Sequence, residues 1–442
     1  MTVYLREDIA ALWSGRDPMQ EAFSLEGEIY RNVARRKTLR VSIGGKYYFV
    51  KLHFGVGWVE VFKNWLQLKR PVLGAENEYQ ACRDLAATGL AAPLAAAYGV
   101  ANGSLASRRS FVLCDELTGR ASLEDVTERW PELDFAPQRP VIESLHAYLQ
   151  VIGKLPTRSL PWCNHSWHLA LRVVPRGFRS YPVFAQNGEA EVLVDCHRST
   201  VGVEISAGFA ESFAITGQSV AEFHDQLTQL LREAGVETDI SGAPNEVEDA
   251  VPFAQDTRGR VWDQQAIAKI HRAFSDANRV FEQFRTGFVG KSSPSHLFWG
   301  SFDLAVTRFS GREAPVHPGG FPNLPDDVTR EAYSHEVASA GFWLGGGGVE
   351  EAAFYAYGYP SPEGLENAKV GPQAAYWHEQ LGEWVLPYAN VCASNDPDAM
   401  LMEFLETSYT AVAELAKWDR TALEIPFGAY GKPYDVAHHR AD

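Results

Sequence analysis

The sequence predicts an α+β fold that is divided between two domains, and three observations support this prediction. The chain has 442 residues, of which 45% are hydrophobic and 22% charged, which suits a folded protein of more than one domain. Residues 1–130 contain 17 Lys and Arg and 15 Asp and Glu, although the whole chain carries a net charge of −16. Along the chain, β-hairpin patterns come first and amphipathic helices follow, which is typical of α+β folds.

A proline-rich stretch at residues 130–140 favours extended or turn backbone and marks the predicted boundary. We therefore expect one domain at residues 1–130, a larger α+β domain with a mainly antiparallel sheet at 131–424, and a loose tail at 425–442.

Composition excludes several classes of protein. A net charge of −16 lacks the basic footprint of a nucleic-acid binder, so we expect no nucleic-acid partner. No apolar run is long enough to span a bilayer, and the first residues do not resemble a signal peptide. Five scattered cysteines without a Cys-x-x-Cys pair predict free thiols in a reducing compartment. Together these features predict a cytoplasmic protein.

The first domain shows strands followed by a helix. Two β-rich runs, 38–43 and 46–51, flank Gly44-Gly45 and predict a hairpin that ends at Lys51. Residues 76–85 predict a helix that contains Glu78, and residues 110–117 predict a strand that leads into a polar hinge. A strand Lys, a helix Glu and a hinge strand are parts of a kinase small lobe.

Several motifs in order resemble the lipopolysaccharide core heptose kinases over residues 8–130. They include Glu26-Gly-Glu-Ile-Tyr-Arg31, Tyr48-Phe-Val-Lys-Leu-His53, Pro71-Val-Leu-Gly-Ala75 and Glu78-Tyr-Gln-Ala81. The resemblance implies ATP and Mg²⁺ as cofactors, with Lys51 at the nucleotide phosphates and Glu78 as its partner. It also implies a hinge beside the adenine at Asp115, Glu116 and Leu117. The basic cluster at 31–40 is either a solvated hairpin or a contact for phosphate or, peripherally, for an anionic glycolipid.

The kinase pattern is incomplete after Trp130. A kinase also needs a catalytic-loop Asp with a following Asn, and a second Asp that holds Mg²⁺. Asp195-Cys-His-Arg198 has the wrong order, and nothing else between residues 131 and 424 matches. We therefore expect a fusion of an incomplete nucleotide-binding lobe with another domain, without autonomous phosphoryl transfer.

Hydrophobic periodicity and capping signals predict the elements of the second domain. The expected helices are 140–155, 219–234 with a Ser219–Glu222 capping box, 263–288, 325–340 and 397–418. The expected strands are 167–174, 191–196, 200–205, 212–215, 296–309 and 352–359.

This domain resembles an uncharacterised bacterial family, a domain of unknown function, from Trp130 to about Glu424. The motifs that carry the resemblance include Asn164-His-Ser-Trp-His168, His317-Pro-Gly-Gly320, Arg330-Glu-Ala-Tyr-Ser-His-Glu336 and Phe354-Tyr-Ala-Tyr-Gly-Tyr-Pro360. The family brings no activity with it, so its polar residues are interpreted by their chemistry.

One hypothesis is a metal-dependent enzyme, because His and carboxylate side chains are ligands for divalent metals. The candidate metal ligands are His165, His168, His296, His317, His335 and Glu331. On the expected helix, Glu331 and His335 share a face. The candidate catalytic residues are His296, Asp303, His317, His335 and Glu336. The alternative is that these side chains are satisfied in the core or solvated at the surface.

A second hypothesis is a pocket for a small anionic ligand. Trp299, Trp343, Tyr355 and Tyr357 would form aromatic walls, and Arg308 and Arg312 would bind a carboxylate or phosphate. The alternatives are an aromatic core and an internal Asp303–Arg308 ion pair. A non-enzymatic interaction protein remains a third hypothesis.

Overall fold

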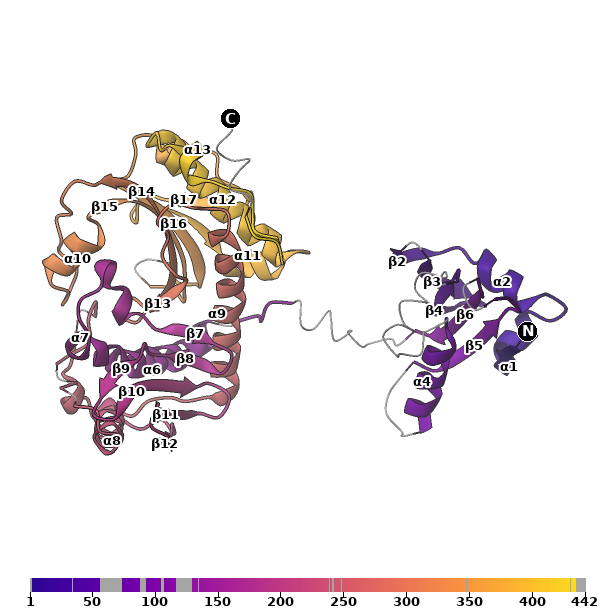
Figure 1. The fold of residues 1–442 in the computed structure, drawn as a ribbon, viewed down its shortest axis with the longest axis horizontal. Coiled ribbons are helices and arrows are strands. Elements are labelled where there is room, and N and C mark those ends of the chain that lie inside the picture. The colour runs from indigo at the N-terminus through magenta and orange to yellow at the C-terminus, as the bar shows by residue number, and fades with distance from the viewer. Residues whose placement is uncertain are drawn as a thin grey trace. The chain divides into compact units, whose positions relative to one another are not determined.

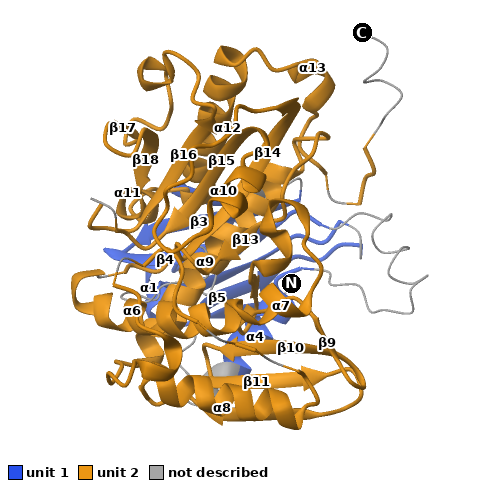
Figure 2. Ribbon diagram, turned by 90° about the vertical axis from the view of Figure 1, so that its left-hand side faces the viewer, with its two compact units in different colours: residues 1–126 blue, residues 127–442 orange. Residues whose placement is uncertain are grey.

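The computed structural model describes residues 2–33, 35–55, 74–87, 93–104, 107–116, 129–133, 135–237, 239–240, 242–247, 249–346, 349–429 and 431–434. The chain divides into two compact units, Met1–Val126 and Thr127–Asp442 (Figure 2). Both units combine helices with antiparallel sheets (Figure 1), so the α+β fold class is confirmed. Within the described ranges, every strand pairing is antiparallel.

The smaller unit contains a six-stranded sheet in the order β1-β5-β6-β4-β3-β2. Its strands are β1 (Thr2–Leu5), β2 (Glu28–Val33), β3 (Arg36–Ile43), β4 (Lys46–His53), β5 (Ala95–Val100) and β6 (Ser110–Asp115). The predicted hairpin is confirmed, because β3 pairs with β4 around Gly44 and Gly45. Both glycines have positive φ angles, 58° and 80°, which a two-residue hairpin turn of this kind requires.

Helices cover both faces of this sheet. On one face, Tyr48, Val50 and Leu52 of β4 join a core with side chains of α1 (Glu7–Leu12) and α2 (Pro18–Ser24). On the other face lies α4 (Glu76–Ala87), where Tyr79 stacks on Tyr98 with ring centroids 4.4 Å apart. Because side chains alternate along a strand, Lys51 points to the face that α4 covers.

The larger unit contains two further six-stranded sheets. The second sheet has the order β12-β11-β10-β8-β7, with β9 paired to β10, and the third has the order β13-β14-β15-β16-β18-β17. The second sheet consists of β7 (Arg172–Val174), β8 (Gly177–Arg179), β9 (Val183–Ala185), β10 (Gly188–Asp195), β11 (Thr200–Ile205) and β12 (Ala210–Ala214). The third consists of β13 (His296–Phe298), β14 (Asp303–Glu313), β15 (His335–Trp343), β16 (Ala353–Tyr359), β17 (Tyr376–His378) and β18 (Glu383–Pro387).

A long helix, α9 (Gln264–Arg285), contacts both of these sheets through β7 and β14 (Figure 1). The other helices are α6 (Phe135–Gly153), α7 (Leu155–Ser159), α8 (Val220–Glu233), α10 (Asp326–Ala332), α11 (Tyr388–Cys392), α12 (Pro397–Leu415) and α13 (Arg420–Leu423). Three 3₁₀ turns complete the unit: η1 (Asn164–Leu169), η2 (Phe253–Gln255) and η3 (Leu365–Asn367). The capping box at Ser219 is present as predicted. One continuous core joins side chains from α6, α8, α9 and α12 with both sheets.

The helix expected at residues 325–340 is wrong in its second half. Helix α10 ends at Ala332, and His335 begins the central strand β15. Ala338 and Ala340 favour a helix by propensity, but the strands on both sides of β15 override that preference. Glu331 and His335 therefore do not share a helix face.

The strand expected at residues 296–309 is interrupted by a turn. Residues 299–302 connect β13 to β14, and Phe302 in this turn has φ of +60°. The resulting hairpin pairs Phe298 with Asp303. Two further boundaries differ, because α6 starts five residues before Pro140 and η1 replaces the first part of the strand expected at 167–174.

Candidate functional sites

The smaller unit brings Lys51 and Glu78 together. Lys51 Nζ lies 2.9 Å from Glu78 Oε2, and Arg36 Nη2 donates to Glu78 Oε1 at 2.8 Å. Lys51 is held centrally in the sheet, between Thr38 of β3 and Val112 of β6. Its side chain is 37% exposed, so the ammonium group is accessible while Glu78 orients it.

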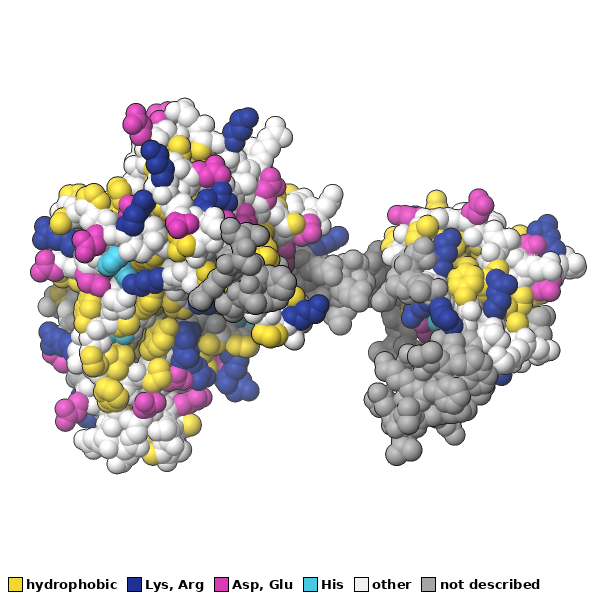
Figure 3. Space-filling model, turned by 45° about the horizontal axis from the view of Figure 1, so that its top comes forward, with side chains coloured by type: hydrophobic (Ala, Val, Ile, Leu, Met, Phe, Trp, Pro, Cys, Tyr) yellow, Lys and Arg dark blue, Asp and Glu magenta, His cyan; other side chains and the backbone are white. Residues whose placement is uncertain are grey.

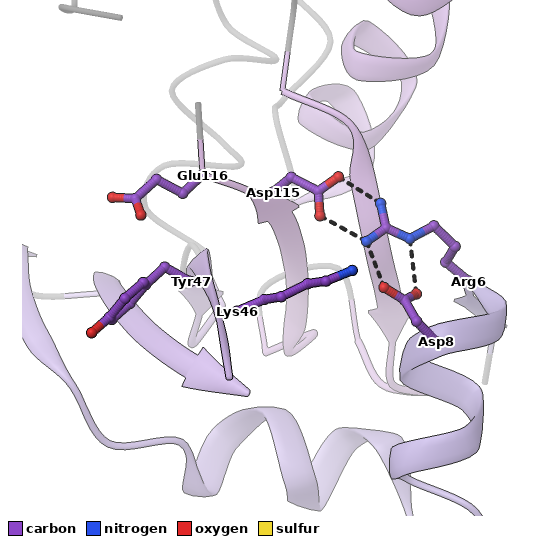
Figure 4. Close-up of a pocket in the computed structure, with 6 residues that line it drawn as sticks. All are labelled: Arg6, Asp8, Lys46, Tyr47, Asp115 and Glu116. Carbon is purple, nitrogen blue, oxygen red and sulfur yellow. Dashed lines mark hydrogen bonds and ion pairs between the residues drawn. The ribbon is translucent and has the colours of Figure 1, made fainter. Parts of the chain in front are cut away.

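The carboxylates expected at the hinge form ion pairs within the unit. Arg6 donates to both oxygens of Asp115, at 2.6 and 2.7 Å, and also binds Asp8 (Figure 4). These bonds from Arg6 hold the pKa of Asp8 well below its usual range. Arg40 binds Glu116 at 2.7 Å. A pocket of about 570 Å³ is lined by Arg6, Asp8, Lys46, Tyr47, Asp115 and Glu116. Arg40 is not among the residues that line it. Leu117 lies outside the described residues.

In the larger unit, the two faces of the third sheet differ sharply. One face packs against α9 and α12 and carries apolar side chains such as Leu304, Phe342 and Phe354. We call the opposite one the polar face. By strand register its polar and aromatic members include Asp303, Thr307, Ser339, Trp343, Tyr355, Tyr357, Tyr359 and Glu383, and its apolar members include Ala305, Phe309, Val337, Ala353 and Val385.

One end of the polar face is acidic. Asp303 is only 8% exposed, and it accepts hydrogen bonds from the hydroxyls of Ser301 and Tyr355. Within the described ranges it forms no ion pair, and burial raises its pKa. Burial, followed by the negative charge of Asp303, raises the pKa of Glu246 and of Glu383 to about 7. We call Asp303, Glu246 and Glu383 the acidic end.

Tyrosines surround the acidic end. The hydroxyls of Tyr333 and Tyr357 lie 2.7 Å apart, and the rings of Tyr355 and Tyr357 stack with centroids 6.0 Å apart. Trp343 contacts Tyr355 edge-on, with centroids 5.6 Å apart. His317 stacks on Tyr333 at 4.8 Å. The predicted aromatic wall thus includes Trp343, Tyr355 and Tyr357.

The other end of the polar face contains a Lys–His pair. Lys291 Nζ lies 2.6 Å from His165 Nε2, and His165 Nδ1 lies 2.9 Å from the carbonyl oxygen of Ala332. Glu331 accepts the backbone N–H of His165 at 2.8 Å, and the ring of His335 lies 6.3 Å from that of His165. Three candidate metal residues therefore meet here, together with a lysine that the sequence did not single out.

Neither predicted anion-binding arginine faces this site. Arg308 lies on the apolar face because it is five residues from Asp303 on one strand, which excludes the expected Asp303–Arg308 pair. Its guanidinium is 3.5 Å from the ring centroid of Phe284 and donates to the Phe284 carbonyl and to Glu406. Arg312 binds Glu336 at 2.6 Å and the Ala416 carbonyl at the end of α12.

The remaining candidates are separated from one another. His296 is 1% exposed, its Nδ1 is 3.0 Å from the Ala305 carbonyl, and burial lowers its pKa to about 4. His168 lies in η1 and accepts the backbone N–H of Cys163. Trp299 packs against Gly153 in the core. Among the residues that the structure describes, no three His, Cys, Asp or Glu side chains are placed to hold a metal ion.

Sequence reasoning missed Glu246, Glu383, Tyr333 and Lys291. Glu246 sits in a stretch that resembles an ordinary acidic loop, but Gln150 of α6 and Lys154, which follows α6, hold the neighbouring Asn245. Tyr333 lies in a segment assigned to a helix interior. Lys291 follows a Gly and has no periodic signal of its own. The motif at residues 330–336 and the predicted aromatic residues Tyr355 and Tyr357 were the sequence signals that pointed to this region.

Figure 3 shows acidic and basic side chains interspersed over the visible face of each unit, with hydrophobic side chains between them. No helix in these ranges is long and apolar enough to cross a membrane.

Comparison with known proteins assigns a class to each unit. Residues 20–158 match the lipopolysaccharide kinase (Kdo/WaaP) family, so the N-terminal region is kinase-like. Residues 130–425, two thirds of the chain, match a family of unknown function, DUF5996. The chain belongs to the DUF5996 family. The kinase match extends past residue 130, where the resemblance was expected to end, through α6.

The curated relatives are kinases of the lipopolysaccharide core. The heptose(I) kinase WaaP of Pseudomonas aeruginosa is 40% identical over 147 residues, which cover 33% of this chain and 55% of that protein. WaaP of Escherichia coli is 40% identical over 128 residues, covering 29% and 48%. A structure of WaaP in complex with acyl carrier protein is 30% identical with a TM-score of 0.24, covering 35% of this chain and 54% of that one. The chain spans about half the length of the relatives that it matches.

Proposed function

We propose that the kinase-like unit binds a nucleotide through its phosphates and that the chain does not transfer phosphate by itself. The 2.9 Å contact between Lys51 Nζ and Glu78 Oε2 carries this proposal. In protein kinases a strand lysine paired with a helix glutamate binds the nucleotide phosphates, and the pair must be formed for activity. Here the pair is formed, so Glu78 orients the ammonium group of Lys51.

The absence of phosphoryl transfer is inferred from the sequence of the rest of the chain. Catalysis by kinases depends almost entirely on positioning and on metal-bound carboxylates. Residues 131–424 contain no catalytic-loop motif in the required order. Half of a kinase would then serve as a nucleotide-responsive module, in the cytoplasm, where ATP is present and the five free cysteines stay reduced.

Calorimetric titration of the full chain with Mg-ATP tests the proposal. We expect saturable binding that Lys51→Met weakens at least about tenfold, because one charge-assisted contact contributes about 1.5–3 kcal/mol. Lys37→Met is the matched control, since Lys37 lies on the neighbouring strand β3 and pairs with Leu52, so its side chain points to the face opposite to Lys51. Absence of binding in the unsubstituted chain, or equal binding by Lys51→Met, would contradict the proposal.

For the larger unit we propose small-molecule binding on the polar face. The observation in favour is the buried Asp303, which has neutral partners only and is surrounded by accessible aromatic side chains. An anionic ligand would be repelled at the acidic end, and both predicted arginines are already paired. An anionic group would therefore have to bind near Lys291. A metal-dependent reaction has no supporting cluster within the described residues.

A thermal-shift screen with small carboxylates and small amines tests this second proposal. We expect at least one compound to raise the unfolding temperature, and Tyr355→Phe to reduce that shift because the hydroxyl that binds Asp303 is lost. Tyr4→Phe is the control, as Tyr4 is 38% exposed on β1 of the smaller unit. If only an added partner protein raises the unfolding temperature, and neither the carboxylates nor the amines do, the larger unit would instead be an interaction domain.

A further inference from the structure

Two of the five cysteines face each other in the smaller unit. The Sγ atoms of Cys82 and Cys114 lie 3.8 Å apart, and both residues are half-buried free thiols. Cys82 belongs to α4 and Cys114 to β6, so the contact joins segments that are 32 positions apart in the sequence. A disulfide bond is about 2 Å long, so the two sulfur atoms would have to approach by less than about 2 Å to form one.

This pair of thiols lies beside the contact between Lys51 and Glu78. Glu78 and Cys82 are one turn apart on α4, so their side chains share a face of the helix. Val112 and Cys114 alternate onto one face of β6, and Lys51 is paired with Val112 on the neighbouring strand. The two thiols therefore join the helix that carries Glu78 to the strand that leads into the expected hinge.

The first part of α4 is held to the sheet by non-covalent contacts. Ser110 of β6 accepts the backbone N–H of the residue just before the helix at 3.0 Å, and Tyr79 stacks on Tyr98. Cys82 lies one turn after Tyr79, where a covalent bond to β6 would hold the next part of the helix. In protein kinases the position of the corresponding helix controls whether its glutamate reaches the lysine. A bond at Cys82 would therefore keep Glu78 in place.

We propose that Cys82 and Cys114 form a redox-responsive pair, which hydrogen peroxide converts into a disulfide that fixes α4 against β6. The consequence for the nucleotide rests on the function proposed above, because the disulfide holds Glu78 beside Lys51. In a reducing compartment the pair consists of two thiols, and the disulfides that form there are usually transient and either catalytic or redox-sensing.

The reaction uses one molecule of hydrogen peroxide for each disulfide. The Cys82 sulfur attacks one peroxide oxygen, the O–O bond breaks, and the products are a sulfenic acid and one water molecule. The Cys114 sulfur then attacks the Cys82 sulfur, the S–O bond breaks, and the hydroxyl leaves with the Cys114 proton as a second water molecule. The two sulfur atoms lose two electrons, which the peroxide oxygens gain. Burial, followed by the proximity of Cys82, raises the pKa of Cys114, which leaves the first attack to Cys82.

Peptide mapping of the full-length chain tests the proposal. The protein is treated with hydrogen peroxide at pH 7, digested without reductant and analysed by mass spectrometry. We expect a linked pair of peptides that contain Cys82 and Cys114, loss of two of the five free thiols, and recovery of both with dithiothreitol. Cys82→Ser should abolish the link, whereas Cys163→Ser, at a half-buried cysteine of the larger unit, should leave it unchanged. Absence of the link, or a link that joins only separate copies of the chain, would overturn the proposal.

Amide hydrogen exchange measures whether the bond fixes the helix. We expect the amides of α4 to exchange at least about tenfold more slowly in the oxidised chain, because the crosslink disfavours opening of the helix from the sheet. The amides of α9, in the larger unit, should exchange at the same rate in both forms. Unchanged exchange in α4 of the crosslinked protein would overturn the fixing of the helix.

Calorimetry with Mg-ATP separates this proposal from nucleotide binding. We expect the oxidised chain to bind Mg-ATP at least as tightly as the reduced chain, because Glu78 stays beside Lys51. Binding that oxidation weakens would overturn the proposed effect on the site. A disulfide that forms and slows exchange in α4, in a chain that binds Mg-ATP in neither form, would refute the nucleotide proposal alone.

Discussion

At the scale of single residues, the charged groups of Lys51 and Asp303 lie in opposite environments. Lys51 is partly exposed and paired with Glu78, so its charge costs little desolvation. Asp303 is buried beside two hydroxyls, and two further carboxylates face it. Bringing carboxylates together without a cation is unfavourable when they are ionised. Such an arrangement is typical of binding or catalytic sites, where perturbed pKa values gather.

The acidic end should make stability depend on pH. Because the folded pKa values of Glu246 and Glu383 are raised to about 7, their protonated forms stabilise the fold. That stability is fully present below about pH 4.5 and is lost as pH rises through 7. We expect Glu246→Gln with Glu383→Gln to be more stable than the unsubstituted chain at pH 8 by about 2 kcal/mol per carboxylate, and equally stable near pH 4.5.

Urea unfolding of the larger unit, followed in the full chain at both pH values, measures this difference. Glu363→Gln serves as the control, because Glu363 is exposed and away from the acidic end. A stability difference that is the same at pH 8 and pH 4.5 would show that the two carboxylates do not titrate as a group around Asp303.

At the scale of elements, helix α6 holds the loops next to the acidic end in position. The ring of Trp299 lies flat over Gly153 at the end of α6, where a Cβ atom would be 2.2 Å from two ring atoms. Gln150 binds the backbone of Asn245 and Gly300, next to Glu246 and Ser301. The helix therefore holds the loop that carries Glu246 and also the loop that carries Ser301, whose hydroxyl donates to Asp303.

Gly153→Ala should destabilise the larger unit in spite of alanine's higher helix propensity. The added methyl group would displace Trp299, and overpacking of this kind costs about 1–3 kcal/mol. Denaturant unfolding monitored by tryptophan fluorescence gives the change. Gly259→Ala is the matched control, because nothing lies within 4 Å of its Cβ position. A neutral or stabilising effect of Gly153→Ala would show that Trp299 can move at no cost.

At the scale of the whole molecule, the chain consists of two units with separate cores. The core of the smaller unit includes Leu113, and that of the larger unit includes Phe281; the two clusters share no residue. Each unit has its own antiparallel sheets and covering helices. Units of this kind unfold as separate cooperative transitions.

Two core substitutions should therefore act on different transitions. We expect Leu113→Ala to destabilise the smaller unit by about 2–5 kcal/mol, and Phe281→Ala to destabilise the larger unit by about 3–5 kcal/mol. Differential scanning calorimetry of the full chain should show each variant lowering one transition temperature and leaving the other in place. A single transition that both substitutions lower together would mean that the units unfold as one.

The sequence by itself determined the features that depend on neighbours along the chain. The Gly44-Gly45 hairpin, the Ser219 capping box and most helices of the larger unit follow from local turn chemistry and periodicity. The Lys51–Glu78 pair followed from ordered kinase motifs, and the two family matches confirmed the resemblances to the lipopolysaccharide kinases and to a family of unknown function.

Tertiary structure decided what depends on contacts between distant segments. It made residues 335–343 a central strand, because β14 and β16 supply hydrogen bonds on both sides. It turned Arg308 into the core and grouped Glu246, Asp303 and Glu383, which lie far apart in the sequence. It also placed Lys291 against His165 across 126 positions. Spacing along the chain carries no information about such pairs, since they depend on strand register and on packing between loops and sheets.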